Sequence, residues 1–226
     1  MRWIGIIRIL AIVFTLLSTW YLAEQLFTSK WETSSLRKIF DNGVKPQKVQ
    51  KKIYRKCGND KDCAENYFAF RIISGAANVV GPSMCLEDTI LMSGVKNNIG
   101  RGLNIAIVNA STGHLIKTGH YDMYSGDVKD VHKFFEPVED GSLIFMASYD
   151  DVATKLDDEV RNMFGGFGSN YAKNLGFRDS WAFVGGKGLK TKSPFEQYIK
   201  NDQKTNKYDG WPEVLEISGC IPKKMD

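Results

Sequence analysis

From Tyr67 to near the C-terminus, apolar and polar side chains alternate in short runs bounded by Gly, Asn or Asp. This period of two is typical of strands that bury one face. The runs predict six strands, at residues 68–73, 103–108, 115–121, 143–148, 180–184 and 215–217. A domain built from many short strands has to stack its apolar faces on one another, which favours two antiparallel sheets.

Helical periodicity is confined to three short segments, at residues 127–135, 151–164 and 193–199. The second segment ends at a pair of glycines, and Asp150 and Asp151 near its start are interpreted as its N-terminal caps. The third begins Ser-Pro-Phe-Glu, which is typical of a helix N-terminus. The expected fold class is α+β, mainly β: two antiparallel sheets packed as a β-β-α sandwich with about three short helices.

The first part of the chain has a different pattern. Arg2 and Arg8 frame the start of an apolar run, and residues 9–23 carry no charged side chain. This pattern is typical of a secretory signal peptide, and the run is shorter than the roughly 20 residues that span a bilayer. We expect a signal peptide at 1–25, with no stable membrane insertion after its cleavage. The alternatives are an uncleaved signal anchor, because a bulky residue stands two positions before Ala23, and a buried N-terminal core helix.

Charge is unevenly distributed along the chain. The formal net charge is +4, but residues 1–29 carry +1 and residues 30–56 carry +7, so residues 57–226 carry −4. A nucleic-acid-binding domain has its positive charge on a folded face, so no nucleic-acid partner is expected here. We interpret residues 26–56 as a basic flexible spacer and 57–226 as a single globular domain. A patch for proteoglycans or anionic membranes is the alternative for the spacer.

The cysteines also indicate export. Cys57, Cys63, Cys85 and Cys220 form an even set downstream of the leader, without a C-x-x-C pair or zinc-like spacing to histidine. Two disulfides are therefore expected rather than a metal site, with three connectivities left open. No metal or other cofactor is expected. The sequon that begins at Asn109 lies between two predicted strands, so this asparagine is a predicted glycosylation site at an exposed hairpin tip.

No combination of residues in the sequence indicates catalysis. There is no G-x-S-x-G motif, the three histidines have no neighbouring nucleophile, and the glycines around Lys187 lack the spacing of a phosphate-binding loop. We therefore do not expect an enzyme.

The strongest candidate for a binding site is Arg178, Asp179 and Trp181, at the start of a predicted strand. Aromatic faces and charged side chains are the groups that bind the C–H surfaces and hydroxyls of sugars. The alternative is a buried Arg–Asp pair beneath a core tryptophan.

A connected series of motifs extends this interpretation. In chain order they are SGAANVVGP (74–82), VKNNIGRG (95–102), ASYDD (147–151), GFRDSW (176–181), KSPFE (192–196) and NKYDGWPE (206–213). From about Tyr54 to Pro222 the chain resembles the secreted family that includes the interleukin-like inducer of epithelial–mesenchymal transition and the pancreatic-derived factor. That domain is also similar to the GG-type lectin domain in the stem of an O-mannosyl-glycan glycosyltransferase.

The resemblance implies two antiparallel sheets flanked by short helices, and the disulfides Cys57–Cys85 and Cys63–Cys220. It implies a non-enzymatic cytokine- or hormone-like protein, secreted through the ER and Golgi, that acts on a cell-surface receptor. The lectin similarity implies the alternative of direct glycan binding through Arg178, Asp179 and Trp181, with retention in the Golgi as a variant. A family member that dimerises covalently has an unpaired cysteine where this chain has Val184, so a disulfide-linked dimer is not expected.

Overall fold

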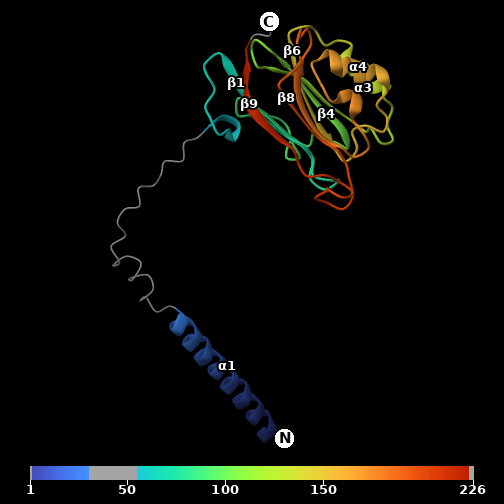
Figure 1. The fold of residues 1–226 in the computed structure, drawn as a ribbon. Helices are drawn as coiled ribbons and strands as arrows, with labels where there is room; N and C mark the ends of the chain where they lie inside the picture. The colour runs from blue at the N-terminus through green and yellow to red at the C-terminus, as the bar shows by residue number, and fades with distance from the viewer. Residues whose placement is uncertain (1, 31–54, 224–226) are drawn as a thin grey trace. The chain divides into compact units, whose positions relative to one another are not determined.

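The computed structural model describes residues 2–30 and 55–223, which fall in two separate units (Figure 1). The N-terminal unit contains one helix, α1 (Arg2–Lys30), which covers the predicted apolar run. Its hydroxyl side chains bond back to carbonyls of the preceding turn, as Thr19 does to Thr15 O at 2.9 Å. Among the described residues, no helix combines the length and apolar character needed to cross a bilayer.

Helix α1 extends beyond the predicted end of the signal peptide at residue 25, and the division into signal peptide and spacer stays a prediction. Residues 26–30 belong to α1 and are helical. The prediction of a flexible spacer over 31–54 lies outside the described residues. The chain is next described at Arg55, immediately before the short 3-10 helix η1 (Lys56–Gly58).

The C-terminal unit is built from two antiparallel sheets. The smaller sheet has the order β3-β2-β1-β9, and the larger has the order β5-β4-β6-β7-β8. The strands are β1 (Tyr67–Ile73), β2 (Ser83–Leu86), β3 (Thr89–Met92), β4 (Gly102–Asn109), β5 (Leu115–Tyr121), β6 (Ser142–Tyr149), β7 (Ser180–Gly186), β8 (Phe195–Ile199) and β9 (Glu216–Pro222). The helical elements of this unit beyond η1 are α3 (Lys129–Phe135), α4 (Asp158–Gly166) and η2 (Ala172–Asn174).

The larger sheet is the middle layer of the domain. Figure 1 shows α3 and α4 on one side of it and strands β1 and β9 on the other. Along β7, Trp181 and Phe183 point into the core beneath the helices, whereas Ala182 and Val184 point into the core between the sheets. A strand buried on both faces has an unbroken apolar sequence, and all of β7 is buried. The predicted β-β-α sandwich is confirmed.

One predicted helix is a strand. Residues 193–199 begin with Ser193, whose hydroxyl donates to Val184 O and accepts from Phe195 N at 3.1 Å. The side chain therefore holds an extended turn instead of capping a helix, and β8 then pairs along β7 from Phe195 opposite Val184. The Ser-Pro sequence favours a helix locally, but hydrogen bonding to the edge of β7 makes this segment a strand. The short strands β2 and β3 were not predicted.

The predicted caps at Asp150 and Asp151 are also wrong. Helix α4 begins later, at Asp158, and its N-cap is Asp157, whose side chain accepts from Val160 N at 2.8 Å. The segment between β6 and α4 is instead irregular, and it frees both aspartates for the contacts described below.

Two disulfides connect the start of the domain to its smaller sheet. Cys57–Cys85 links η1 to β2, and Cys63–Cys220 links the segment before β1 to β9. This is the pairing that the resemblance implies. All four cysteines of the chain are used within it, so an interchain disulfide would require one of these bonds to break.

Candidate functional site

Antiparallel pairing brings the starts of β4 and β7 and the ends of β5, β6 and β8 to one edge of the larger sheet. Gly102 pairs with Tyr149 at this edge, and Ser180 pairs with Ile199. The loops beyond these residues therefore meet, although they are far apart in the sequence. They carry Arg101, Asp122, Asp150, Phe177, Arg178 and, from the loop between β8 and β9, Trp211.

Trp181, the tryptophan predicted to contact a ligand, lies in the core. It has no exposed surface, and its indole stacks against Phe183 and Phe164 with ring centroids 5.6 and 6.0 Å apart. Its Nε1 donates to Glu196 Oε1 at 2.9 Å. A sugar cannot stack on an indole whose faces are covered, so the predicted contact is corrected to the alternative role, a core side chain beneath the helices.

Asp179 is also buried, and it holds the loop before β7 in place. One carboxylate oxygen accepts from Gly176 N at 2.6 Å and from the Tyr198 hydroxyl at 2.8 Å, while the other accepts from Asn201 N at 2.7 Å. Burial, together with the hydrogen bond to this carboxylate, raises the pKa of Tyr198 to about 12. Asp179 therefore positions its neighbours and presents little surface to a ligand.

Arg178 is the member of the predicted set that faces the surface. Its guanidinium carbon lies 3.9 Å from the centroid of Trp211 and 4.7 Å from that of Phe177. Its Nε lies 3.7 Å from Asp150 Oδ1, which also accepts from Trp211 Nε1 at 3.0 Å. This Nε is buried, and among the described residues it has no hydrogen-bond partner. Cation–π contacts and an adjacent carboxylate thus fix the guanidinium in place.

The backbone beneath this arrangement is unusual. Asp150 and Arg178 both have left-handed φ angles, 61° and 59°, although neither is glycine. Each is anchored by a hydrogen bond, from Asp150 N to Ala77 O at 3.1 Å and from Arg178 N to Asp151 Oδ1 at 3.3 Å. Such conformations cost of order 1–3 kcal/mol each and cluster at functional sites, where the surroundings over-determine them. The two hydrogen bonds therefore hold Asp150 and Arg178 in place across from one another.

A second arginine–aspartate pair lies beside the first. Arg101 donates from Nε to Asp122 Oδ1 at 3.2 Å, and its Nη2 donates to the second carboxylate oxygen, Oδ2. The hydrogen bond from Arg101 is the largest cause that holds the pKa of Asp122 well below its usual range. The two pairs are joined through aromatic rings, because Arg101 lies over Tyr124, whose centroid is 6.4 Å from that of Phe177.

We call this set of residues the Arg178 surface, defined as Arg101, Asp122, Tyr124, Asp150, Phe177, Arg178 and Trp211. Its aromatic rings are part-exposed, with Tyr124 51% and Phe177 46% accessible. Fixed guanidinium donors, carboxylate acceptors and exposed aromatic faces are groups that recognise hydroxyl-rich or carboxylate ligands.

The predicted glycosylation site lies away from these loops, at the other end of β4. Asn109 is exposed, and its side-chain oxygen accepts from Ser111 N at 3.0 Å and from Thr112 N at 2.9 Å. These bonds form the turn between β4 and β5, so the sequon occupies the expected hairpin tip. Attachment of a glycan there stays a prediction.

Comparison with known proteins places this geometry in a family. The family model of the interleukin-like EMT inducer matches residues 101–189, a span that holds Arg101, Asp150 and Arg178. Protein FAM3D of Mus musculus is 50% identical over 225 residues, covering 100% of both chains. Protein FAM3C of Danio rerio is 53% identical over 227 residues, also covering 100% of both. The chain belongs to the FAM3 family. Protein FAM3A of Mus musculus is a further FAM3 relative, 48% identical over 99% of this chain and 98% of its own.

The FAM3 membership confirms the resemblance found in the motifs, and the structure shows what those motifs have in common. Four of the six supply the Arg178 surface: VKNNIGRG ends close to Arg101, ASYDD contains Asp150, GFRDSW contains Arg178, and NKYDGWPE contains Trp211. Asp150 was not predicted to belong to the site, because its position before a helical segment is typical of a cap. Trp211 was not predicted either, because it lies 33 residues after Arg178. The shared position of these motifs at strand ends was the signal that could have found them.

Proposed function

We propose that this FAM3 protein is a secreted, cytokine-like signalling protein that binds a cell-surface receptor through the Arg178 surface of its lectin-like domain, residues 57–226. It acts by binding and not as an enzyme. The observation that carries the proposal is the Arg178 guanidinium, held against Trp211 and beside Asp150 at a strained, part-exposed loop edge.

Secretion is supported by three independent features. The chain starts with a basic and then apolar leader, the domain contains two disulfides, and the matched family model is that of an interleukin-like protein. Disulfides form and persist in the secretory pathway and outside the cell. Glycosylation at Asn109 belongs to the same proposal.

Binding through the Arg178 surface is supported by its composition and rigidity. Arginine, tryptophan and tyrosine are the residues most enriched among those that dominate binding energy. Side chains already fixed before binding lose less conformational entropy when the partner docks. Arg178 is fixed by two rings and a carboxylate, so it is preorganised in this sense.

A second candidate function is direct carbohydrate recognition by the same surface. It is favoured by the combination of part-exposed aromatic rings with a neighbouring guanidinium and carboxylate, those of Arg178 and Asp150. The contact set then differs from the one predicted from sequence: Asp150 and Trp211 take the places of Asp179 and Trp181 beside Arg178.

Cell-surface binding by protein purified from mammalian culture medium tests the proposal. Arg178→Lys removes the planar guanidinium but keeps the charge, and it should weaken saturable binding at least about tenfold. Arg71→Lys is the matched control. Arg71 pairs with Glu216 on the other sheet and has a side chain 33% exposed, against 31% for Arg178. Its binding should equal that of the wild type.

Two results would contradict the proposal: retention of the intact chain in Golgi membranes, and equal binding by the Arg178→Lys and Arg71→Lys proteins. Enzymatic removal of cell-surface glycans distinguishes the two candidate functions. Binding to a protein receptor should survive the treatment, whereas direct carbohydrate recognition should be lost with the glycans and reproduced on a glycan array.

A further inference from the structure

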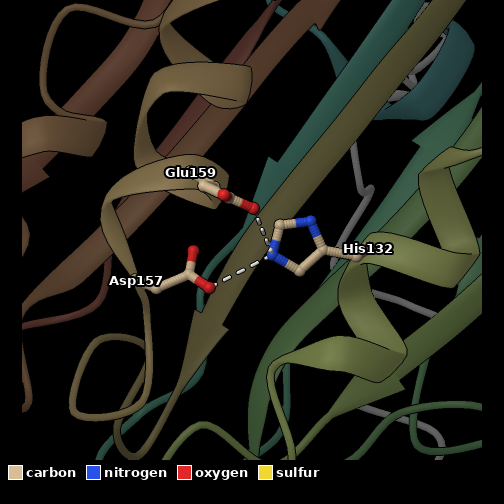
Figure 2. A group of neighbouring side chains, drawn as sticks. All are labelled: His132, Asp157 and Glu159. Carbon is tan, nitrogen blue, oxygen red and sulfur yellow. Dashed lines mark hydrogen bonds and ion pairs between the residues drawn. The ribbon is translucent and has the colours of Figure 1, made fainter.

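A separate cluster of polar side chains lies between the two helices that cover the larger sheet. His132 on α3 faces Asp157 and Glu159 at the start of α4 (Figure 2). The imidazole Nε2 lies 3.1 Å from Asp157 Oδ2 and 3.8 Å from Glu159 Oε2, and the three ligand atoms all lie within 4.8 Å of one another. None of these residues belongs to the Arg178 surface.

Helix capping explains only part of this cluster. Asp157 accepts from Val160 N through Oδ1, so its other oxygen, Oδ2, is the one that faces His132. Acidic residues at a helix N-terminus complement the helix dipole, which accounts for the carboxylates of α4. It does not account for an imidazole that reaches them from a different helix, with one ring nitrogen facing both carboxylates (Figure 2).

We propose that His132, Asp157 and Glu159 form a binding site for a divalent transition-metal ion of the zinc class. Bonds from zinc to nitrogen and oxygen ligands are about 2.0–2.2 Å long, so ligands of a tetrahedral ion lie roughly 3.3–3.6 Å apart. The distances of 3.1 and 3.8 Å from Nε2 bracket this value, and the two carboxylate oxygens lie within 4.8 Å of one another, so side-chain rotations can bring the three groups into position.

The chemistry of the ligands selects the class of ion. Imidazole suits zinc and its neighbours, whereas calcium and magnesium prefer sites made only of oxygen. The ion bonds to the Nε2 lone pair of a neutral imidazole, whose proton is then carried on Nδ1, and the carboxylates supply two negative charges. Three protein ligands leave the fourth position of a tetrahedral ion to water.

The bound ion would cross-link two parts of the helical layer. Helix α3 precedes β6 and α4 follows it, so the three ligands join segments on either side of a central strand. A ligand that binds only the folded state stabilises it in proportion to the logarithm of its excess over Kd. At zinc concentrations about a hundred times Kd, we expect the Tm of this domain to rise by roughly 5–10 °C.

Isothermal titration of the full secreted protein, without a histidine tag and stripped with a chelator, tests the site with zinc chloride. We expect one zinc ion per chain and the rise in Tm. His132→Gln should abolish measurable binding, and Glu159→Gln should raise Kd at least about tenfold. Because the Glu159 side chain is 85% exposed, the second variant should fold even if the first does not.

Two matched controls keep the result specific. Asp158→Asn removes the same charge from the same helix turn, and His114→Gln removes an exposed histidine elsewhere; neither residue belongs to the cluster. Both should bind zinc as the wild type does. The absence of stoichiometric zinc binding by the wild type, equal Kd values for Glu159→Gln and Asp158→Asn, or equally tight calcium binding would each overturn the proposal. In the first two cases the cluster is only a polar contact between two helices, and in the third it is a cation site without preference for the zinc class.

Discussion

Two tryptophans of this domain make the same hydrogen bond and have opposite roles. Trp181 donates from Nε1 to Glu196 at 2.9 Å, and Trp211 donates from Nε1 to Asp150 at 3.0 Å. Phenylalanine rings stack on Trp181 and leave it no exposed surface, whereas a charged guanidinium lies over Trp211. The group that covers the ring, and not the polar bond at its edge, separates a core side chain from a recognition side chain.

The largest effect is expected in the core. Trp181→Ala should lower the free energy of unfolding by about 3–5 kcal/mol, because it leaves a cavity between two aromatic rings. Urea denaturation followed by circular dichroism measures the loss. A Trp181→Phe protein retains most of the volume and should lose clearly less, which keeps the test usable if the alanine variant does not fold. A loss below about 1 kcal/mol in the alanine variant would mean that Trp181 is not a core residue.

Asp179 is expected to show the next largest effect. Asp179→Asn replaces an acceptor-only carboxylate with an amide whose NH₂ group must face at least one of the donors Gly176, Tyr198 or Asn201. Leaving a buried donor unsatisfied costs about 1–3 kcal/mol, so urea denaturation should report a loss of roughly 2 kcal/mol.

Asp150→Asn tests the same substitution at the Arg178 surface instead of in the buried region. The amide oxygen of the new side chain can still accept from Trp211 Nε1. This variant should lose little stability but should weaken partner binding, measured by the cell-surface assay. If the Asp179 variant keeps its stability and only the Asp150 variant loses it, the two regions have been assigned the wrong way round.

Alkaline pH gives a smaller and more specific effect. The pKa of Tyr198 is about 12 in the folded protein and about 10 in an unfolded chain. Its neutral form is therefore favoured by folding, so this stability is fully present below pH 10 and is lost as the pH rises toward 12. Because the side chain is only part-buried, we expect less than about 1 kcal/mol.

Phenolate absorbance during an alkaline titration measures the effect, and Tyr198→Phe removes the late-titrating group. If the variant has the same titration curve as the wild type above pH 10, Tyr198 is not the group with the raised pKa.

The smallest effect is expected at the exposed pair beside the Arg178 surface. The pKa of Asp122 is lowered in the folded state, so its contribution to stability is present above the unfolded pKa of about 4 and is lost as the pH falls further. Exposed ion pairs contribute little, so Asp122→Asn should lower Tm at pH 7 by no more than about 2–4 °C. At pH 2 the difference from the wild type should shrink; a difference that grows would contradict the sign.

The part of the fold that was predictable is the part with a local pattern. Alternation located β1, β4, β5, β6, β7 and β9, and apolar spacing indicated α3 and α4, although α4 begins later than expected. Residues 193–199 were assigned to a helix because a Ser-Pro start looks the same before a helix and before this strand. This segment is a strand because it pairs with the edge of β7.

The candidate site was predictable only in part, for a similar reason. Arg178 was found because its motif concentrates charged and aromatic residues. Alternation assigned Trp181 to a face but carried no information on whether helices cover that face. Asp150 was mistaken for a cap, because acidic residues before a helix are usually caps and the later start of α4 at Asp158 was not visible.

The amino-acid sequence by itself determined the leader pattern, the strands with one alternating face, the even set of cysteines and membership of the FAM3 family. Each of these depends on residue order or on local periodicity. Only the tertiary structure decided which tryptophan is buried, which aspartate faces Arg178, and that His132 meets the start of α4. The contacts of Arg178 with Asp150 and of His132 with Asp157 join residues 25 or more positions apart. They form because sheet pairing and the burial of apolar faces bring distant loops and helices together.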